Sequence, residues 1–168
     1  MVDTYRELEI QFAKFAKADY AVSCSTGTAA LHLALKAVGV CAGDEVLVPD
    51  FTMAACAFAV SYCGAKPIFV DVEIPSYGMN PDLIEEKITS RTKAIMVVHV
   101  YGRLARIADI ARIAKKHNLP IIEDASEAHG AANYSPSTST ITCYSFYKNK
   151  IIHGEEGGIC VTNNYHLA

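Results

Sequence analysis

The feature that most constrains the fold is a repeated change between short apolar runs and segments with helical spacing. The runs are mostly continuous rather than alternating, which is typical of strands covered on both faces. We therefore predict an α/β fold, a three-layer α/β/α arrangement around a mostly parallel seven-stranded sheet. The seven runs are AVSCS (21–25), EVLVP (45–49), PIFVDV (67–72), KAIMVVHV (93–100), LPIIEDA (119–125), TITCYSF (140–146) and GGICVTN (157–163).

Helices are expected between these runs, at about 4–16, 28–38, 53–63 and 107–117, with a short one opened by Asn80-Pro81. Gly39 and Gly64 follow two of them, and glycine is common just past a helix end. No Pro/Gly/Ser linker divides the chain. Residues 1–168 are therefore expected to form a single domain.

Composition narrows the classes of function. Apolar residues make up 51% of the chain, enough to fill a sizeable core, and the formal net charge of −3 gives no basic surface. Binding to nucleic acid or to an anionic membrane is therefore disfavoured. The N-terminal segment is charged and amphipathic, unlike a signal sequence, and no window approaches about 18 uninterrupted apolar residues.

The six cysteines are scattered in apolar surroundings and show neither a CxxC pair nor the spacing of a metal site. They are typical of small buried residues in a reducing compartment. We expect a cytoplasmic protein without a bound metal.

In open parallel sheets, ligands bind beyond the carboxyl ends of the strands. The first notable strand end is SCSTGTAALHLAL (23–35), in which small residues open a helix. Free amides at a helix N-terminus can bind a phosphate, and Gly27 would let it approach the backbone closely. The alternative is that Ser25 and Thr26 are ordinary helix caps, and the segment taken alone favours that alternative.

The second strand end is IIEDASEAHGA (121–131), in which Glu123 and Asp124 follow an apolar strand. Successive strand residues point to opposite faces, so at most one carboxylate faces a ligand. We choose Asp124, which could hold a basic ring nitrogen in its protonated form; a carboxylate that only caps the next turn is the alternative. His129 could be a base or a ligand, but a structural role is the better interpretation.

The third is TCYSFYKNKIIHGEEGGICV (142–161), where Lys148 and Lys150 flank Asn149. Adjacent side chains diverge, so only one lysine is expected to face the site. An exposed loop lysine is the usual interpretation, but here a possible phosphate site and a strand-end acid lie at the same sheet edge. Together the three groups indicate pyridoxal phosphate (PLP) and Schiff-base chemistry at the lysine.

These segments resemble the fold-type I PLP enzymes, and within them the DegT/DnrJ/EryC1/StrS family of nucleotide-sugar aminotransferases. The resemblance runs from TGTAALHLAL through GDEVLVPDFT, YCGAKPIFVDVE and VVHVYG to HNLPIIEDASEAHGA and SFYKNKIIHGEEGG, the last two being the most specific. It implies an enzyme that moves an amino group, usually from L-glutamate, to a keto group of a nucleotide-linked deoxysugar. It also implies a homodimer.

The resemblance assigns roles to individual positions. Lys150 matches the lysine that bonds to the cofactor and moves the proton, and Asp124 matches the acid on the pyridine nitrogen. Glu127 falls where the family has Gln or Glu near the cofactor ring, and Met53 stands where a stacked aromatic ring is common. The implied phosphate contacts are Gly27, Thr28, Ala29 and Ser145.

The chain also departs from the family. His153 lies in a turn that more often is rich in threonine, which bears on substrate fit. Family members are more than twice as long, so the chain is expected to be the large cofactor-binding domain, without the small C-terminal domain. Two other interpretations stay open: a different fold-type I activity on a small amino acid, such as decarboxylation or aldol cleavage, and a non-catalytic PLP-binding or dimerisation module.

Overall fold

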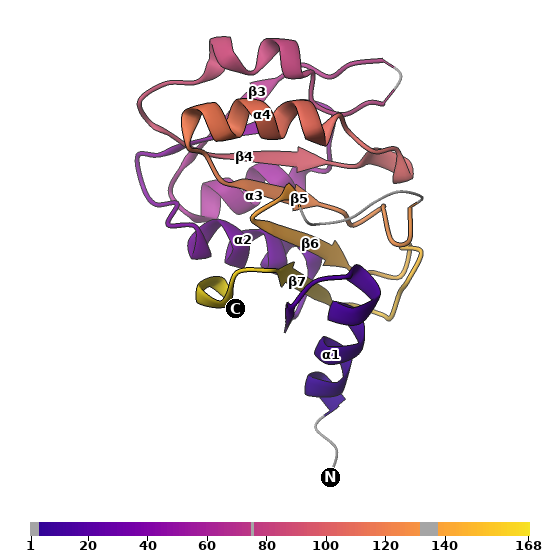
Figure 1. The fold of residues 1–168 in the computed structure, drawn as a ribbon. Helices are drawn as coiled ribbons and strands as arrows, with labels where there is room; N and C mark the ends of the chain where they lie inside the picture. The colour runs from indigo at the N-terminus through magenta and orange to yellow at the C-terminus, as the bar shows by residue number, and fades with distance from the viewer. Residues whose placement is uncertain (1–3, 75, 132–137) are drawn as a thin grey trace.

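The computed structural model describes residues 4–74, 76–131 and 138–168 and contains one seven-stranded sheet with helices on both faces (Figure 1). The helices are α1 (Thr4–Ala16), α2 (Gly27–Ala37), α3 (Ala54–Tyr62) and α4 (Ile107–His117). The strands are β1 (Tyr20–Cys24), β2 (Glu45–Pro49), β3 (Lys66–Val70), β4 (Thr92–Val98), β5 (Ile121–Asp124), β6 (Ile141–Ser145) and β7 (Gly158–Thr162).

The strand order is β1-β7-β6-β5-β4-β2-β3. Among the seven described strands, only β7 runs antiparallel to its neighbours, β1 and β6. The pairs β2·β3, β2·β4, β4·β5 and β5·β6 are parallel. The expected mostly parallel seven-stranded sheet is confirmed. The carboxyl ends of β2, β4, β5 and β6 therefore meet at one edge.

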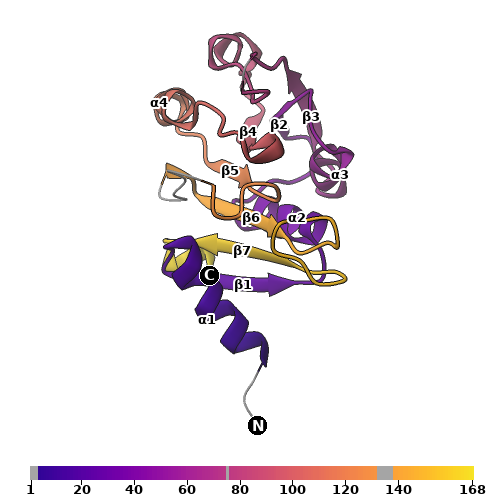
Figure 2. The ribbon, with the colours of Figure 1, turned by 90° about the vertical axis from the view of Figure 1, so that its right-hand side faces the viewer.

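Two layers of helices cover the sheet, as Figure 2 shows from the side. Helices α2 and α3 pack on one face, where Leu31, Leu35 and Met96 are among the buried residues of the core. Helix α4 packs on the other face through Ile110. Helix α1 covers the β6·β7 end of that face, with Phe12 in a third buried cluster. Apolar side chains on both faces explain why the strand runs are continuous.

Among the differences from the expected elements, two concern the segment after Asn80 and the end of β4. The segment after Asn80 forms two single-turn 3-10 helices, Pro81–Leu83 and Glu85–Lys87, closed by short-range bonds such as Ile84 N to Pro81 O at 3.2 Å. Strand β4 ends at Val98, two residues before the end of its apolar run, because Tyr101 has a left-handed φ of 53° and turns the chain. Within the described ranges, no helix has the length and apolar character needed to cross a membrane.

Candidate active site

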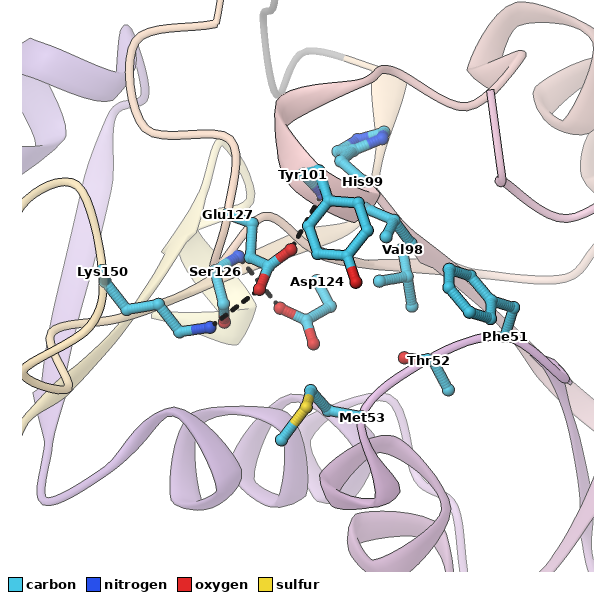
Figure 3. Close-up of a pocket in the computed structure, with 11 residues that line it drawn as sticks. Phe51, Thr52, Met53, Val98, His99, Tyr101, Asp124, Ser126, Glu127 and Lys150 are labelled. Atoms are coloured by element: carbon cyan, nitrogen blue, oxygen red, sulfur yellow. Dashed lines mark hydrogen bonds and ion pairs between the residues drawn. The ribbon is translucent and has the colours of Figure 1, made fainter. Parts of the chain in front are cut away.

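A cavity opens at the sheet edge where the parallel strands end, and four residues line both of its adjoining halves: Met53, Asp124, Ser126 and Lys150. The half beside α2 has a volume of about 270 Å³, and the half beside the turn after β4 about 160 Å³. Together they reach the lower part of the size range of small-molecule sites, roughly 300–1,000 Å³. Figure 3 shows the half beside the turn after β4.

Lys150 reaches the cavity from the turn that follows β6. The turn folds back because the Lys150 amide donates to Tyr147 O at 2.8 Å and the Gly154 amide donates to Phe146 O at 2.8 Å. The Lys150 side chain is only 10% exposed. Lys148 points elsewhere, with its Nζ 5.7 Å from the centre of the Tyr147 ring. Of the two candidate lysines, the structure brings Lys150 into the cavity.

The Glu127 carboxylate lies between Lys150 and the turn after β4 (Figure 3). Lys150 Nζ donates to Glu127 Oε1 at 3.2 Å, and the Tyr101 amide donates to Oε2 at 2.8 Å. The left-handed conformation of Tyr101 directs its amide toward this carboxylate. Glu127 thus fixes the amine of Lys150 relative to two strand ends.

The two acids at the end of β5 point to opposite sides, as strand alternation predicts. Asp124 lines the cavity, and its Oδ1 accepts the Ser126 amide at 3.0 Å. Glu123 is fully buried on the other side, where its Oε2 lies 2.6 Å from Nε2 of His99. The Ala105 amide donates to His99 Nδ1, so Nε2 carries the proton donated to Glu123. Asp124 is the acid available to a ligand.

The first turn of α2 borders the half of the cavity that contains Ser145. Thr26 caps the helix and accepts the Ala29 amide on Oγ1 at 3.0 Å, which is the alternative that the segment alone favoured. The amides of Gly27 and Thr28 belong to the first turn of the helix, where backbone N–H groups have no carbonyl partner within the helix. Both residues line the cavity. Ala29 is half-buried and does not line it.

Gly27 owes its identity to a neighbouring strand. A Cβ at Gly27 would lie 2.6 Å from Cβ of Ser145 and 2.9 Å from its Oγ. The expected reason for this glycine was the close approach of an anion to the backbone. The structure adds a second reason: Gly27 admits the end of β6, which brings the Ser145 hydroxyl beside the first turn of α2. The approach of an anion to this glycine stays a prediction.

Met53 precedes α3, is 67% exposed and lines both halves of the cavity. The sequence did not single out its companions Phe51, Thr52 and Tyr101. The strand-end rule would have found all three, because Phe51 and Thr52 follow β2 closely and Tyr101 follows β4. His153 is exposed and does not line the cavity.

His129 has a structural environment, as expected. It is 5% exposed and packs among the rings of Phe12, Tyr144 and Phe146. Neither ring nitrogen has a hydrogen-bond partner in the described part of the chain. Burial, reinforced by the positive charge of Lys150, lowers the pKa of His129 from 6.5 to about 4. The ring is therefore neutral near pH 7.

Comparison with known proteins identifies the family. The model of the DegT/DnrJ/EryC1/StrS aminotransferase family matches residues 2–168. The chain belongs to this family. The chain is 45% identical over 165 residues to GDP-perosamine synthase of Caulobacter vibrioides, covering 96% of this chain and 44% of the relative.

A second relative and a solved structure are also similar to this chain. The UDP-2-acetamido-2-deoxy-3-oxo-D-glucuronate aminotransferase of Pseudomonas aeruginosa is 43% identical over 167 residues, covering 96% of this chain and 46% of the relative. The solved structure of NtdA from Bacillus subtilis with bound cofactor PMP superposes with a TM-score of 0.95 at 32% identity, covering 99% of this chain and 38% of that chain. The chain spans less than half the length of these relatives.

The comparisons confirm the sugar-aminotransferase family and the fold-type I architecture expected from the sequence. PMP is pyridoxamine phosphate, the aminated form of PLP. The cofactor in that solved structure therefore agrees with the expected one. The roles of the individual site residues stay predictions.

Proposed function

We propose that residues 1–168 form the large cofactor-binding domain of a PLP-dependent aminotransferase. It would move an amino group from an amino acid, with L-glutamate the expected donor, to a keto group of a nucleotide-linked deoxysugar. The observation that carries the proposal is the convergence of Lys150, Asp124 and the first turn of α2 on one cavity. Both curated relatives described above are named for nucleotide-linked sugars, which supports the substrate class.

The donor set fits PLP. An amine can bond to its aldehyde, a carboxylate can pair with its protonated ring nitrogen, and amides at a helix N-terminus can bind its phosphate. Lys150, Asp124 and the Gly27–Thr28 turn supply these groups, with the Ser145 hydroxyl beside the turn. Ala29 is the weakest of the expected phosphate contacts, because its amide already donates to Thr26. Met53 offers a thioether that can pack against a ring.

When bound, PLP supplies a ring that accepts electrons from the carbon bearing the amino group. Asp124 would keep the ring nitrogen protonated through its carboxylate charge. The Nζ of Lys150 would take the proton from the reacting carbon and return it to the carbon on the other side of the transferred nitrogen. Glu127, 3.2 Å from Nζ, would hold the lysine in place while it is an ammonium.

Titration with PLP tests this proposal. The purified protein should develop the visible absorbance band of PLP bound to a lysine, and Lys150→Ala should abolish that band. Lys148→Ala is the matched control and should keep it, because the Lys148 amine packs against Tyr147 outside the cavity. Absence of a band in the parent protein would contradict cofactor binding by this chain.

The two other interpretations predict different behaviour once the cofactor is bound. Conversion of the bound cofactor to PMP on addition of L-glutamate would support amino transfer. A band that a small amino acid discharges with release of CO₂ or of an aldehyde would favour the other fold-type I activities. A band that no amino acid changes would leave a cofactor-binding module.

We also propose a homodimer in the cytoplasm. The family resemblance supports the dimer, and light scattering coupled to gel filtration would measure it. All six cysteines are free thiols, which is consistent with a reducing compartment. Cell fractionation with an antibody to the native protein would test the location.

A further inference from the structure

A chain of hydrogen bonds, buried at its link to Asp124, reaches this carboxylate from the start of α3. Oδ2 of Asp124 accepts the Cys56 thiol at 3.3 Å, and Sγ of Cys56 lies 3.1 Å from Oγ1 of Thr52. Cys56 is fully buried, and Asp124 is 6% exposed. Cys56 and Asp124 lie 68 residues apart in the sequence, so the packing of α3 on the sheet brings them together.

The direction of these bonds follows from the number of protons. Burial, together with the charge of Asp124, raises the pKa of the Cys56 thiol well above its usual value, so the thiol stays protonated. Its one hydrogen points to the carboxylate. Sγ can then only accept from the Thr52 hydroxyl, because it has no second hydrogen to give.

The Ser126 amide and the Cys56 thiol together fix the plane of the Asp124 carboxylate. Oδ1 accepts the Ser126 amide at 3.0 Å, so each oxygen of Asp124 has one donor from the described part of the chain. A carboxylate has about four acceptor positions, which leaves others for a cation in the cavity. A thiol is a weak donor. It can orient the carboxylate while taking little of its negative charge.

We propose that Thr52 and Cys56 are positioning residues that hold the Asp124 carboxylate in the orientation needed for a protonated ring nitrogen. The importance of this orientation rests on the proposed PLP function. The hydroxyl-to-thiol-to-carboxylate chain itself does not require the cofactor. The competing explanation is that Cys56 only fills space in the core under α3.

The S–H stretch in the infrared spectrum tests the chain without cofactor. Subtracting the Cys56→Ala spectrum from the parent spectrum isolates the Cys56 band, which should lie at the low frequency of a hydrogen-bonded thiol. In Asp124→Asn, loss of the negative acceptor should move that band to higher frequency. Cys63, at the other end of α3, is the control, and its band should stay in place. A Cys56 band at the frequency of a free thiol, or one unmoved by Asp124→Asn, would overturn the proposal.

Cofactor affinity gives the second measurement. The thiol is a weak donor, so loss of its hydrogen bond should have the effect of an ordinary rather than a charge-assisted bond: Cys56→Ala should weaken PLP binding by about three- to tenfold. Cys56→Ser keeps a donor and should bind within about twofold of the parent, whereas Thr52→Val should show a smaller loss than Cys56→Ala. Cys63→Ala should leave affinity unchanged. Circular dichroism identifies any variant that fails to fold. If Cys56→Ala does so, the Cys56→Ser spectrum replaces it in the infrared subtraction, and that result decides.

The two proposals fail in different ways. If the parent protein binds no PLP, the proposed function fails, and the infrared bands still decide whether the thiol bonds to Asp124. If the parent binds PLP and the Cys56→Ala and Cys56→Ser proteins bind it equally well, the positioning role is overturned and the proposed function stands.

Discussion

Lys150 Nζ and Glu127 Oε1 lie 3.2 Å apart at the mouth of the cavity, and the same carboxylate accepts the Tyr101 amide through its other oxygen. The Lys150 side chain is 10% exposed and that of Glu127 32%. An amine that donates to a carboxylate must leave that partner before its nitrogen lone pair can attack an aldehyde. The pair therefore sets the orientation of the amine at some cost to its reactivity.

Replacement of the carboxylate should reveal that cost. In Glu127→Gln, the Lys150 amine loses the ion pair that holds it at 3.2 Å, so it should react with PLP faster. Partly exposed ion pairs contribute roughly 0.2–1 kcal/mol, which corresponds to an increase of up to about fivefold. Stopped-flow absorbance measures the rate. An unchanged or slower rate in Glu127→Gln would show that the carboxylate does not restrain the amine.

The close approach of α2 and β6 predicts a strong effect of a single methyl group. In Gly27→Ala, the new Cβ would lie 2.6 Å from Cβ of Ser145, so helix and strand must separate. Overpacking of this kind typically costs about 1–3 kcal/mol in the free energy of unfolding. Urea denaturation followed by circular dichroism measures the change.

Two further variants identify the cause. Ser145→Gly in the Gly27→Ala background removes the clash and should restore part of the lost stability. Gly154→Ala is a matched control, because its Cβ would meet only Glu156 O at 3.5 Å, an ordinary contact. Equal losses in Gly27→Ala and Gly154→Ala would argue against the steric explanation.

The neutral, buried His129 predicts how stability depends on pH. The pKa of His129 is about 4 in the folded protein, against the usual 6.5 that applies to the unfolded chain. The unfolded chain therefore binds a proton first as the pH falls. Stability from this group is therefore complete above about pH 6.5, is lost between pH 6.5 and 4, and changes no further below that range. The difference amounts to roughly 3 kcal/mol.

The His129→Phe protein isolates this contribution. The side chain keeps a ring among Phe12, Tyr144 and Phe146 but cannot be protonated. Unfolding free energies measured at pH 7 and pH 5 should differ less in His129→Phe than in the parent protein. The same pH dependence in both proteins would exclude His129 as its source.

Much of this arrangement can be predicted from local sequence patterns. Continuous apolar runs predicted a sheet covered on both faces, and strand alternation separated Asp124 from Glu123. Strand ends were the correct place to look for the site, since Lys150, Asp124 and the first turn of α2 meet at one edge. The choice of Lys150 over Lys148 came from family resemblance, because a turn has no periodicity from which its side-chain directions could be read.

The contacts between distant segments could not be predicted in this way. The bond from Cys56 to Asp124 depends on how α3 lies on the sheet, and the need for Gly27 depends on the end of β6. The left-handed conformation of Tyr101, which aims its amide at Glu127, has no signal at that residue, since tyrosine seldom adopts it. Such contacts are set by packing, which local sequence patterns do not record.

The most direct test of the central claim is to locate the covalent bond. The protein is mixed with PLP, treated with borohydride to make any bond to a lysine permanent, and digested for peptide mass spectrometry. We predict one pyridoxyl group per chain, on Lys150, with Lys148 unmodified. A stable label on Lys148 or on another lysine, or no label at all, would contradict the assignment of Lys150 as the residue that bonds to the cofactor.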